Sequence, residues 1–345
     1  MKLRLPAEWE KHEATWLAWP KRREDWPGKY SSIKWVYADI IKAISYSETL
    51  NLIVDSEQAE QKVRAILKKS SVDLNRIKFY HINTDRSWIR DYGPFFVRLQ
   101  NKINALSFKF NGWAKYSQWK NDNKVASHIT SNLNIESIRA EYYNKEIILE
   151  GGSIDVNGKG TLITTRQCLL SSSKQVRNRG LSKEDYEQIF NNYFGITNTI
   201  WLNEGIAGDD TNGHIDDICR FVNTDTVVAC HESNPDDTNY KYLKENLEIL
   251  GESRLEDGSK INVIKLPMPE PKYFDGYRLP ASYANFYITN KCVLVPTYND
   301  TNDYKALGIL GELFSDRKVI GINCVDLIWG LGAIHCMTKE QFAQS

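Results

Sequence analysis

Apolar residues recur along the chain with two different periods, which predict helices and strands in alternation. The 3.6-residue period of an amphipathic helix is present in Ser32–Ser47, Ser56–Lys69 and Ser182–Phe194, and the last of these opens with SKED, which fits a capping box. Short apolar runs rich in β-forming residues predict strands at Leu50–Val54, Arg76–His81, Phe95–Leu99, Ala105–Lys109, Thr161–Thr164, Thr199–Trp201, Thr226–Ala229, Lys260–Lys265, Phe286–Thr289, Cys292–Pro296 and Lys318–Ile322. This alternation is typical of an α/β fold.

The sequence contains no boundary between two domains. Its 345 residues, of which 41% are hydrophobic, are enough for one large domain or two ordinary ones. No Gly/Ser-rich or Pro-rich linker separates two halves, so we expect one continuous domain over residues 1–345.

Five apolar, strand-like runs are each interrupted by a polar residue that can take part in chemistry. The runs are WIRDYGPFFV, IILEGGSIDV, NGHIDDICRFV, SYANFYI and GAIHCMT, and they contain Asp91, Glu150, His214, Asn285 and Cys336 at intervals of 59, 64, 71 and 51 residues. Units of this size suggest a ring of similar modules, each offering one polar residue to a shared axis. The spacing is too irregular to decide between such a repeat and unrelated segments.

Charge and cysteine content restrict the class of partner. The 44 acidic and 44 basic residues balance, so bulk charge attracts neither nucleic acid nor an anionic membrane, and we expect a small partner. The N-terminal sequence lacks an export signal, and no apolar run approaches the roughly 20 residues that a bilayer requires, which predicts a cytoplasmic protein. The six cysteines have no CxxC spacing, and we expect them to be reduced.

The segment GHIDDIC combines a histidine with acids. In an extended conformation His214 and Asp216 would lie on one face and Ile215 and Asp217 on the other. His214 can then serve as a base beside an orienting or ligand-binding acid. A zinc site formed by His214, Asp216 and Cys219 is the alternative; it is disfavoured because no second spaced pair of ligands completes it, and we expect no metal.

Cys336 has two interpretations. A cysteine in an apolar stretch is usually an inert small hydrophobic residue. However, Gly330 and Gly332 precede it and permit the close backbone approach that a nucleophile at a strand end needs. The cysteines at 168, 230, 292 and 324 lie in apolar runs without a neighbouring acid or base, and we expect them to be structural.

Asp91 and Glu150 are ambiguous when taken singly. Asp91 in WIRDYGP is either a turn-forming or a functional aspartate, and Glu150 in LEGGS is either a solvated charge at a strand end or a functional acid. A phosphate-binding loop is disfavoured at LEGGS, because it has neither a Walker lysine nor the GxGxxG spacing. Three carboxylates, one histidine and one cysteine are the groups needed to bind a planar cation and attack its carbon.

These residues lie in motifs that resemble the agmatine deiminase / bacterial peptidylarginine deiminase family of the guanidino-group-modifying superfamily, with the agmatine deiminase branch the nearer match. The motifs extend over nearly the whole chain: LPAEWEKHEATWLAWP, DWPGK, WIRDYGP, FNGW, LEGGSIDVNGKGTLITT, GIAGDDTNGHIDDICRFV, LPASYANFYITN and AIHCMTKEQ. The resemblance implies an α/β propeller with five blades of ββαβ type around a pseudo-fivefold axis.

The resemblance also implies a role for each motif residue. Cys336 is expected to be the nucleophile, His214 the general acid/base, and Glu150 the acid that partners histidine and substrate. Asp91 and Asp216 are expected to bind the guanidinium. The remaining implied substrate contacts are Trp88 along the methylene arm, Asp210 at the distal amine, and Asn285 by similarity to the peptidylarginine branch.

Two motifs depart from the family pattern. The run before the catalytic cysteine usually contains GGG but reads Gly330-Leu331-Gly332-Ala333 here, and the usual GWGGK appears as GWAKY at 112–116. We expect the chemistry to be retained and the fit of the substrate to be altered.

The implied activity is hydrolysis of agmatine to N-carbamoylputrescine and ammonia, without a metal or organic cofactor. The alternatives are deimination of peptidyl or free arginine, amidino transfer to an amine, and a non-catalytic propeller that serves as an interaction module. The resemblance allows a homodimer or higher homo-oligomer, and it leaves open whether agmatine feeds polyamine synthesis or supplies nitrogen.

Overall fold

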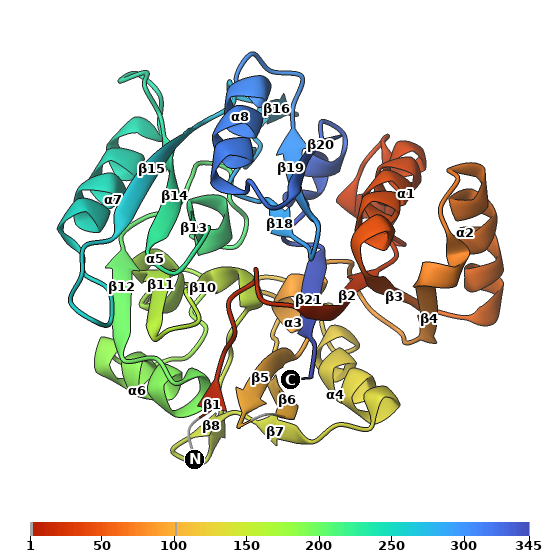
Figure 1. The fold of residues 1–345 in the computed structure, drawn as a ribbon, viewed down its shortest axis with the longest axis horizontal. Coiled ribbons are helices and arrows are strands. Elements are labelled where there is room, and N and C mark those ends of the chain that lie inside the picture. The colour runs from red at the N-terminus through yellow and green to blue at the C-terminus, as the bar shows by residue number, and fades with distance from the viewer. Residues whose placement is uncertain (1–2, 101, 345) are drawn as a thin grey trace.

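A computed structural model describes residues 3–100 and 102–344 and confirms the mixed α/β class (Figure 1). The predicted helices are α1 (Tyr30–Ser47), α2 (Glu57–Lys69) and α6 (Lys183–Phe194). The capping box at the start of α6 is formed by Ser182 and Asp185, whose side chains each accept a hydrogen bond from the backbone N–H of the other. Helices that were not predicted are α3 (Ile89–Tyr92), α4 (Asp122–Leu133), α5 (Arg166–Leu169), α7 (Tyr240–Glu252) and α8 (Asp303–Leu313).

Every predicted strand overlaps a strand of the structure. The strands of the larger sheets are β1 (Leu3–Arg4), β2 (His12–Ala18), β3 (Thr49–Val54), β4 (Ile77–His81), β5 (Phe95–Leu99), β6 (Lys102–Ser107), β7 (Ser137–Arg139), β10 (Ile154–Val156), β11 (Thr161–Thr165), β12 (Asn198–Leu202), β13 (Cys219–Phe221), β14 (Thr226–His231), β15 (Asn262–Pro267), β18 (Tyr287–Ile288), β19 (Cys292–Thr297), β20 (Lys318–Asn323) and β21 (Thr338–Phe342). Short hairpins are formed by β8 (Glu141–Tyr142) with β9 (Lys145–Glu146), and by β16 (Tyr273–Phe274) with β17 (Tyr277–Arg278).

One strand order recurs in the larger sheets. Among residues 3–100 and 102–344, five sheets have the orders β21-β2-β3-β4, β1-β5-β6-β7, β10-β11-β12, β13-β14-β15 and β18-β19-β20. Each contains an antiparallel pair followed by a parallel neighbour, which the chain reaches through a helix. The repeated unit suggested by the polar interruptions is therefore a ββαβ module.

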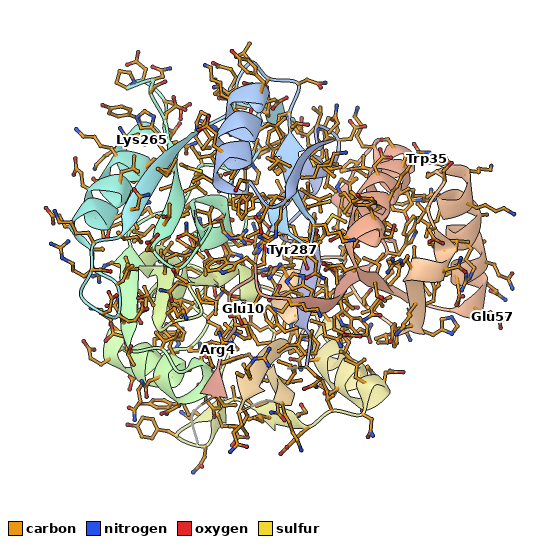
Figure 2. The ribbon with its side chains drawn as sticks, viewed as in Figure 1. Arg4, Glu10, Trp35, Glu57, Lys265 and Tyr287 are labelled. Atoms are coloured by element: carbon orange, nitrogen blue, oxygen red, sulfur yellow. The ribbon has the colours of Figure 1, made fainter. Side chains whose placement is uncertain are left out.

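The modules surround a centre that contains the N-terminal segment. Figure 1 shows α1, α4, α6, α7 and α8 on the outside, with the segment between β1 and β2 running through the middle. In Figure 2, Tyr287 lies near the centre, whereas Trp35 and Glu57 lie at the periphery. The two ends of the chain meet in one sheet, because β2 pairs antiparallel with β21.

Helix α1 closes the space between the first and last sheets. It buries Ile33, Ile40 and Ile44 and contacts β3, β19 and β20. Each fully buried isoleucine contributes roughly 2 kcal/mol, so this face fixes the sheet of β21 relative to that of β20. Across the described residues, no helix has both the length and the apolar composition needed to cross a membrane.

Candidate active site

The polar residues that interrupt the apolar runs all occupy the same place in their modules. Each lies in the turn or short helix just before the strand that begins its ββαβ module: Asp91 before β5, Glu150 before β10, His214 before β13, Asn285 before β18 and Cys336 before β21. All are buried, and the contacts described below bring them together at the centre.

His214 lies among three carboxylates. Its Nδ1 is 3.8 Å from Oδ1 of Asp91 and 4.0 Å from Oδ1 of Asp216, and its Nε2 is 3.7 Å from Oε2 of Glu150. Burial alone would lower the pKa of His214, but the charge of Asp91 and the neighbouring Cys168 and Glu150 raise it well above the usual value. The imidazole is therefore protonated at neutral pH.

The expectation of an extended GHIDDIC segment is wrong. Residues Ile215–Asp217 form a single 3-10 turn, and only His214 before it is extended. Asp216 and Asp217 consequently do not lie on opposite faces, since both carboxylates come within 4.8 Å of the Cys336 Sγ.

Glu150 is held by an arginine that the sequence interpretation missed. Arg177 Nε donates to both carboxylate oxygens, at 3.0 and 3.2 Å, and both side chains are fully buried. Burial would raise the pKa of Glu150, but Arg177 and His214 lower it to about 2. Glu150 is thus an anion at any physiological pH.

Asp91 is oriented by an indole and a backbone amide. Trp113 Nε1 donates to Oδ2 at 2.8 Å and the Gly152 N–H donates to Oδ1 at 3.0 Å. A Cβ at position 152 would lie 2.5 Å from His214 Nδ1 and 3.0 Å from carboxylate oxygens of Asp91 and Asp216. The second glycine of LEGGS therefore keeps open the space between the histidine and the two aspartates.

Asp216 has one occupied and one free carboxylate oxygen. Its Oδ2 is 2.7 Å from Nδ1 of His335, whereas its buried Oδ1 has no hydrogen-bond partner in residues 3–100 and 102–344. Burial would raise the pKa of Asp216, but the hydrogen bond and charge of His335 lower it. The neighbouring Asp217 behaves oppositely: burial and the charge of Asp216 raise its pKa well above the usual value.

Cys336 is a buried thiol among acids. Its Sγ lies 3.8 Å from Oδ2 of Asp216, and Asn285 Nδ2 lies 3.2 Å from the sulfur. Burial, followed by the charges of Asp216, Asp217 and Asp91, raises the pKa of Cys336 well above the usual value. The thiol is therefore protonated at neutral pH while the site contains no cation.

A cavity of about 400 Å³ leads to this thiol. Cys336, Asp91, Trp88 and Trp113 line it, whereas His214, Glu150, Asp216 and Asn285 are not part of its lining. A Cβ at Gly332 would lie 2.9 Å from the Trp88 ring, so this glycine allows the indole to pack beside the nucleophile.

Asp210 also lines the cavity and has several partners. Lys115 Nζ forms an ion pair with Oδ1, and Tyr116 OH donates to Oδ2 at 2.6 Å. Lys115 and Tyr116 belong to the loop that departs from the family pattern, and Trp113 and Ala114 of this loop have positive φ angles of 58° and 52°. The loop thus contacts two carboxylates of the site. Trp113 binds Asp91, and Lys115 and Tyr116 bind Asp210.

Within residues 3–100 and 102–344, two groups of side chains present donor atoms of the kind that bind metals. The atoms of Glu150, Cys168 and His214 lie within 4.8 Å of one another, as do those of Asp216, Asp217 and Cys336. Cys219 belongs to neither group. Because Arg177 occupies both oxygens of Glu150, the first group is poorly suited to a cation.

Sequence reasoning missed Arg177, Trp113, Asp217, His335 and Glu8. Trp113, His335, Asp217 and Glu8 lie inside motifs that the resemblance used, but nothing in the sequence assigned them a role in the site. Arg177 and Glu8 could not be found from spacing, because their partners are 27 and 327 positions away.

The fold and this cluster define a family. The chain belongs to the Porphyromonas-type peptidyl-arginine deiminase family, whose profile matches residues 4–341. It is 34% identical to the agmatine deiminase of Pseudomonas aeruginosa over 363 aligned residues, which cover 98% of this chain and 95% of that protein.

Solved structures give the same result. The agmatine deiminase of Enterococcus faecalis is 31% identical with a TM-score of 0.90, covering 100% of this chain and 97% of that one. The agmatine deiminase of Campylobacter jejuni is 28% identical with a TM-score of 0.86, covering 99% and 97%.

Proposed function

We propose that this protein is an agmatine deiminase, which hydrolyses agmatine to N-carbamoylputrescine and ammonia through a covalent intermediate on Cys336. The full-length similarity to proteins named agmatine deiminases supports the activity. The observation that carries the proposal is the cluster of Cys336, His214 and ionised acids at the inner end of a cavity.

Binding begins with the acids. A guanidinium is planar and always protonated, so its N–H groups require acceptors in their own plane. Asp91 and the free Oδ1 of Asp216 supply them and fix the plane with charge-assisted hydrogen bonds. Trp88 covers the methylene arm, and one face of the guanidinium carbon remains open to Cys336.

The substrate itself ionises the nucleophile. A bound guanidinium offsets the carboxylate charges that raise the pKa of Cys336, so the thiol releases its proton to solvent when the cation binds. His214 is already protonated and cannot take this proton, so it does not serve as the base that ionises Cys336.

Each chemical step transfers one proton through His214. The Cys336 sulfur forms a bond to the guanidinium carbon, and His214 gives its proton to the departing nitrogen. Ammonia then departs, and an S-alkylthiouronium remains on Cys336. Neutral His214 then takes a proton from water as the oxygen bonds to that carbon. Breaking the S–C bond restores the thiolate, the remaining hydroxyl proton passes to solvent, and the neutral ureido product is released.

Asp210 supplies selectivity at the outer end of the substrate. Its carboxylate attracts the terminal ammonium of agmatine and repels the α-carboxylate of arginine. Lys115 offsets part of this charge, so the preference is modest.

The family description supports a second candidate, deimination of peptidylarginine to citrulline. Ammonia release from agmatine, arginine and a blocked arginine peptide, with the product mass, distinguishes the two. Turnover of agmatine alone is expected, and turnover of the peptide alone would refute the proposed function.

We also infer that residues 1–345 form a single catalytic domain whose modules make a five-bladed pseudo-fivefold α/β propeller. The recurring ββαβ order, and the pairing of β2 with β21 that links the two ends of the chain, support this arrangement.

A further inference from the structure

His335, the residue next to the nucleophile, joins two buried carboxylates. Its Nδ1 lies 2.7 Å from Oδ2 of Asp216 and its Nε2 lies 2.7 Å from Oε2 of Glu8. All three side chains are at most 7% exposed. Both carboxylate oxygens are acceptors, so the imidazole fits this place by donating from its ring nitrogens.

Glu8 is itself fixed from several directions. Its Oε1 accepts from the Ile288 N–H at 2.8 Å and lies 3.0 Å from Arg220 Nη2, and its Oε2 lies 3.3 Å from Arg90 Nη2. These partners come from β18, β13 and α3, which belong to different modules. Glu8 therefore holds the His335 ring against the central ends of several sheets.

This arrangement determines which oxygen of Asp216 is available. The hydrogen bond from His335 occupies Oδ2, and Oδ1 is left as the buried acceptor without a partner in the described chain. A carboxylate bound at one oxygen to a fixed donor cannot rotate without breaking that bond. The orientation of Oδ1 thus depends on His335, and through it on Glu8.

We propose that His335 and Glu8 are positioning residues, which hold the ionised Asp216 so that its free Oδ1 receives the guanidinium of the substrate. The inference rests on the proposed function, because it names the residues that prepare that same site. Neither residue reacts: Glu8 orients the ring, and the ring orients Asp216.

Charged groups surround the three side chains on every packed element. Glu8 faces Arg90, Arg220 and His335; Asp216 faces His214, Cys336 and Asp217, with Arg220 and Asp91 nearby. Because so many titrating groups adjoin, the tests below compare variants at one pH.

Two substitutions at His335 separate positioning from packing. The amide of His335→Asn reaches the place of Nδ1 and can still donate to Asp216, whereas that of His335→Gln reaches the place of Nε2 and contacts Glu8 instead. We expect KM for agmatine to stay within about threefold of wild type in His335→Asn and to rise at least about tenfold in His335→Gln. Thermal stability should fall by similar amounts in both. Equal KM values in the two folded variants would overturn the proposal.

Glu8 has a matched control on the same segment. A glutamine at position 8 has one acceptor oxygen where Glu8 uses two, so either the arginine side or the His335 side loses its partner. Glu8→Gln should raise KM for agmatine several-fold, while Glu10→Gln, whose carboxylate pairs with Arg4 away from the site, should leave KM unchanged. Identical KM values in the two variants would contradict the role of Glu8.

A spectroscopic measurement on the wild type does not depend on turnover. With ¹⁵N-labelled histidine, Nδ1 of His335 is expected to carry a hydrogen, and this signal should be absent in His335→Asn. An unprotonated Nδ1 would refute the proposal even if agmatine is turned over. Conversely, a protonated Nδ1 in a protein inactive on agmatine would refute the proposed function and leave the hydrogen-bonded arrangement intact.

Discussion

The sulfur of Cys336 lies 3.8 Å from Oδ2 of Asp216, across a sequence separation of 120 residues. The same oxygen receives the hydrogen bond of His335, so the nucleophile and the ring beside it share one carboxylate. Residues far apart in the sequence thus form a single electrostatic unit, and the contribution of each residue can be measured separately.

Replacing the nucleophile should abolish turnover but not binding. We expect Cys336→Ala to lower kcat by about 10⁴-fold or more, because no other group forms the intermediate, while agmatine still binds to Asp91 and Asp216. Ammonia release and titration calorimetry measure the two effects. Cys324→Ala replaces a buried thiol outside the site and should leave kcat unchanged. Retained turnover in Cys336→Ala would show that the nucleophile is another residue.

The thiol should be unreactive until the site holds a cation. Because burial and nearby acids raise the pKa of Cys336, its alkylation by iodoacetamide should be slow at neutral pH and accelerate only as pH rises into the alkaline range. The measurement is the alkylation rate against pH, with Cys336→Ala giving the background from the other buried thiols. Fast alkylation of the empty enzyme at neutral pH would mean that a thiolate exists before substrate binds.

Two adjacent aspartates should respond differently to the same substitution. Asp216→Asn removes a charged acceptor and should raise KM for agmatine by roughly 10- to 100-fold. Asp217→Asn should change KM less, because burial and the charge of Asp216 raise the pKa of Asp217 well above its usual value and so favour the uncharged carboxyl, which an amide resembles. Steady-state kinetics on both variants test the assignment, which fails if the order of the effects is reversed.

Asp210 should affect only substrates that carry an amine. Asp210→Asn should raise KM for agmatine by a few-fold, since the lost interaction is partly solvated, and leave KM for N-butylguanidine unchanged. The ratio of kcat/KM for the two compounds is the measurement. Equal losses on both would indicate that Asp210 acts through the loop of Trp113 and not on the amine.

Acid should weaken a buried ion pair beside the site. Burial would raise the pKa of Glu340, but Arg90, 2.6 Å away, and Lys339 lower it to about 2. A carboxyl whose pKa is lower in the folded state stabilises the protein at every pH above its pKa in the unfolded chain, which is about 4.5. This stabilisation is lost as the pH falls toward 2. The stability deficit of Glu340→Gln, a few kcal/mol near neutral pH by order of magnitude, should therefore shrink between pH ~5 and pH ~3. Denaturant unfolding at both pH values measures this change, and a deficit of equal size at the two pH values would contradict the role of Glu340.

Much of the fold could be predicted from the alternation of apolar runs, because strands buried on both faces are nearly continuous in hydrophobic residues. Helix α4 has few apolar positions among Ser, Thr and His, so its period is weak. The segment of α7, in contrast, repeats Leu243, Leu247 and Leu250 at helical spacing, and this signal was overlooked.

The site could be predicted only as far as its motifs extend. Asp91, Glu150, His214 and Cys336 interrupt apolar runs and can be recognised for that reason. The turn at Ile215–Asp217 could not be predicted, because the alternation of side chains holds only for an extended backbone and the backbone bends here. The partners of Glu150 and His335 come from remote segments, so only the tertiary structure identifies Arg177 and Glu8.

The pairing of β2 with β21 has a consequence for synthesis of the protein. A nascent chain that has not yet emerged beyond residue 342 leaves an edge of β2 uncovered and lacks the final strand beside the sulfur. Catalytic competence should consequently arise only after β21 has been synthesised, and termination before this strand would yield a polypeptide that is both inert and prone to self-association.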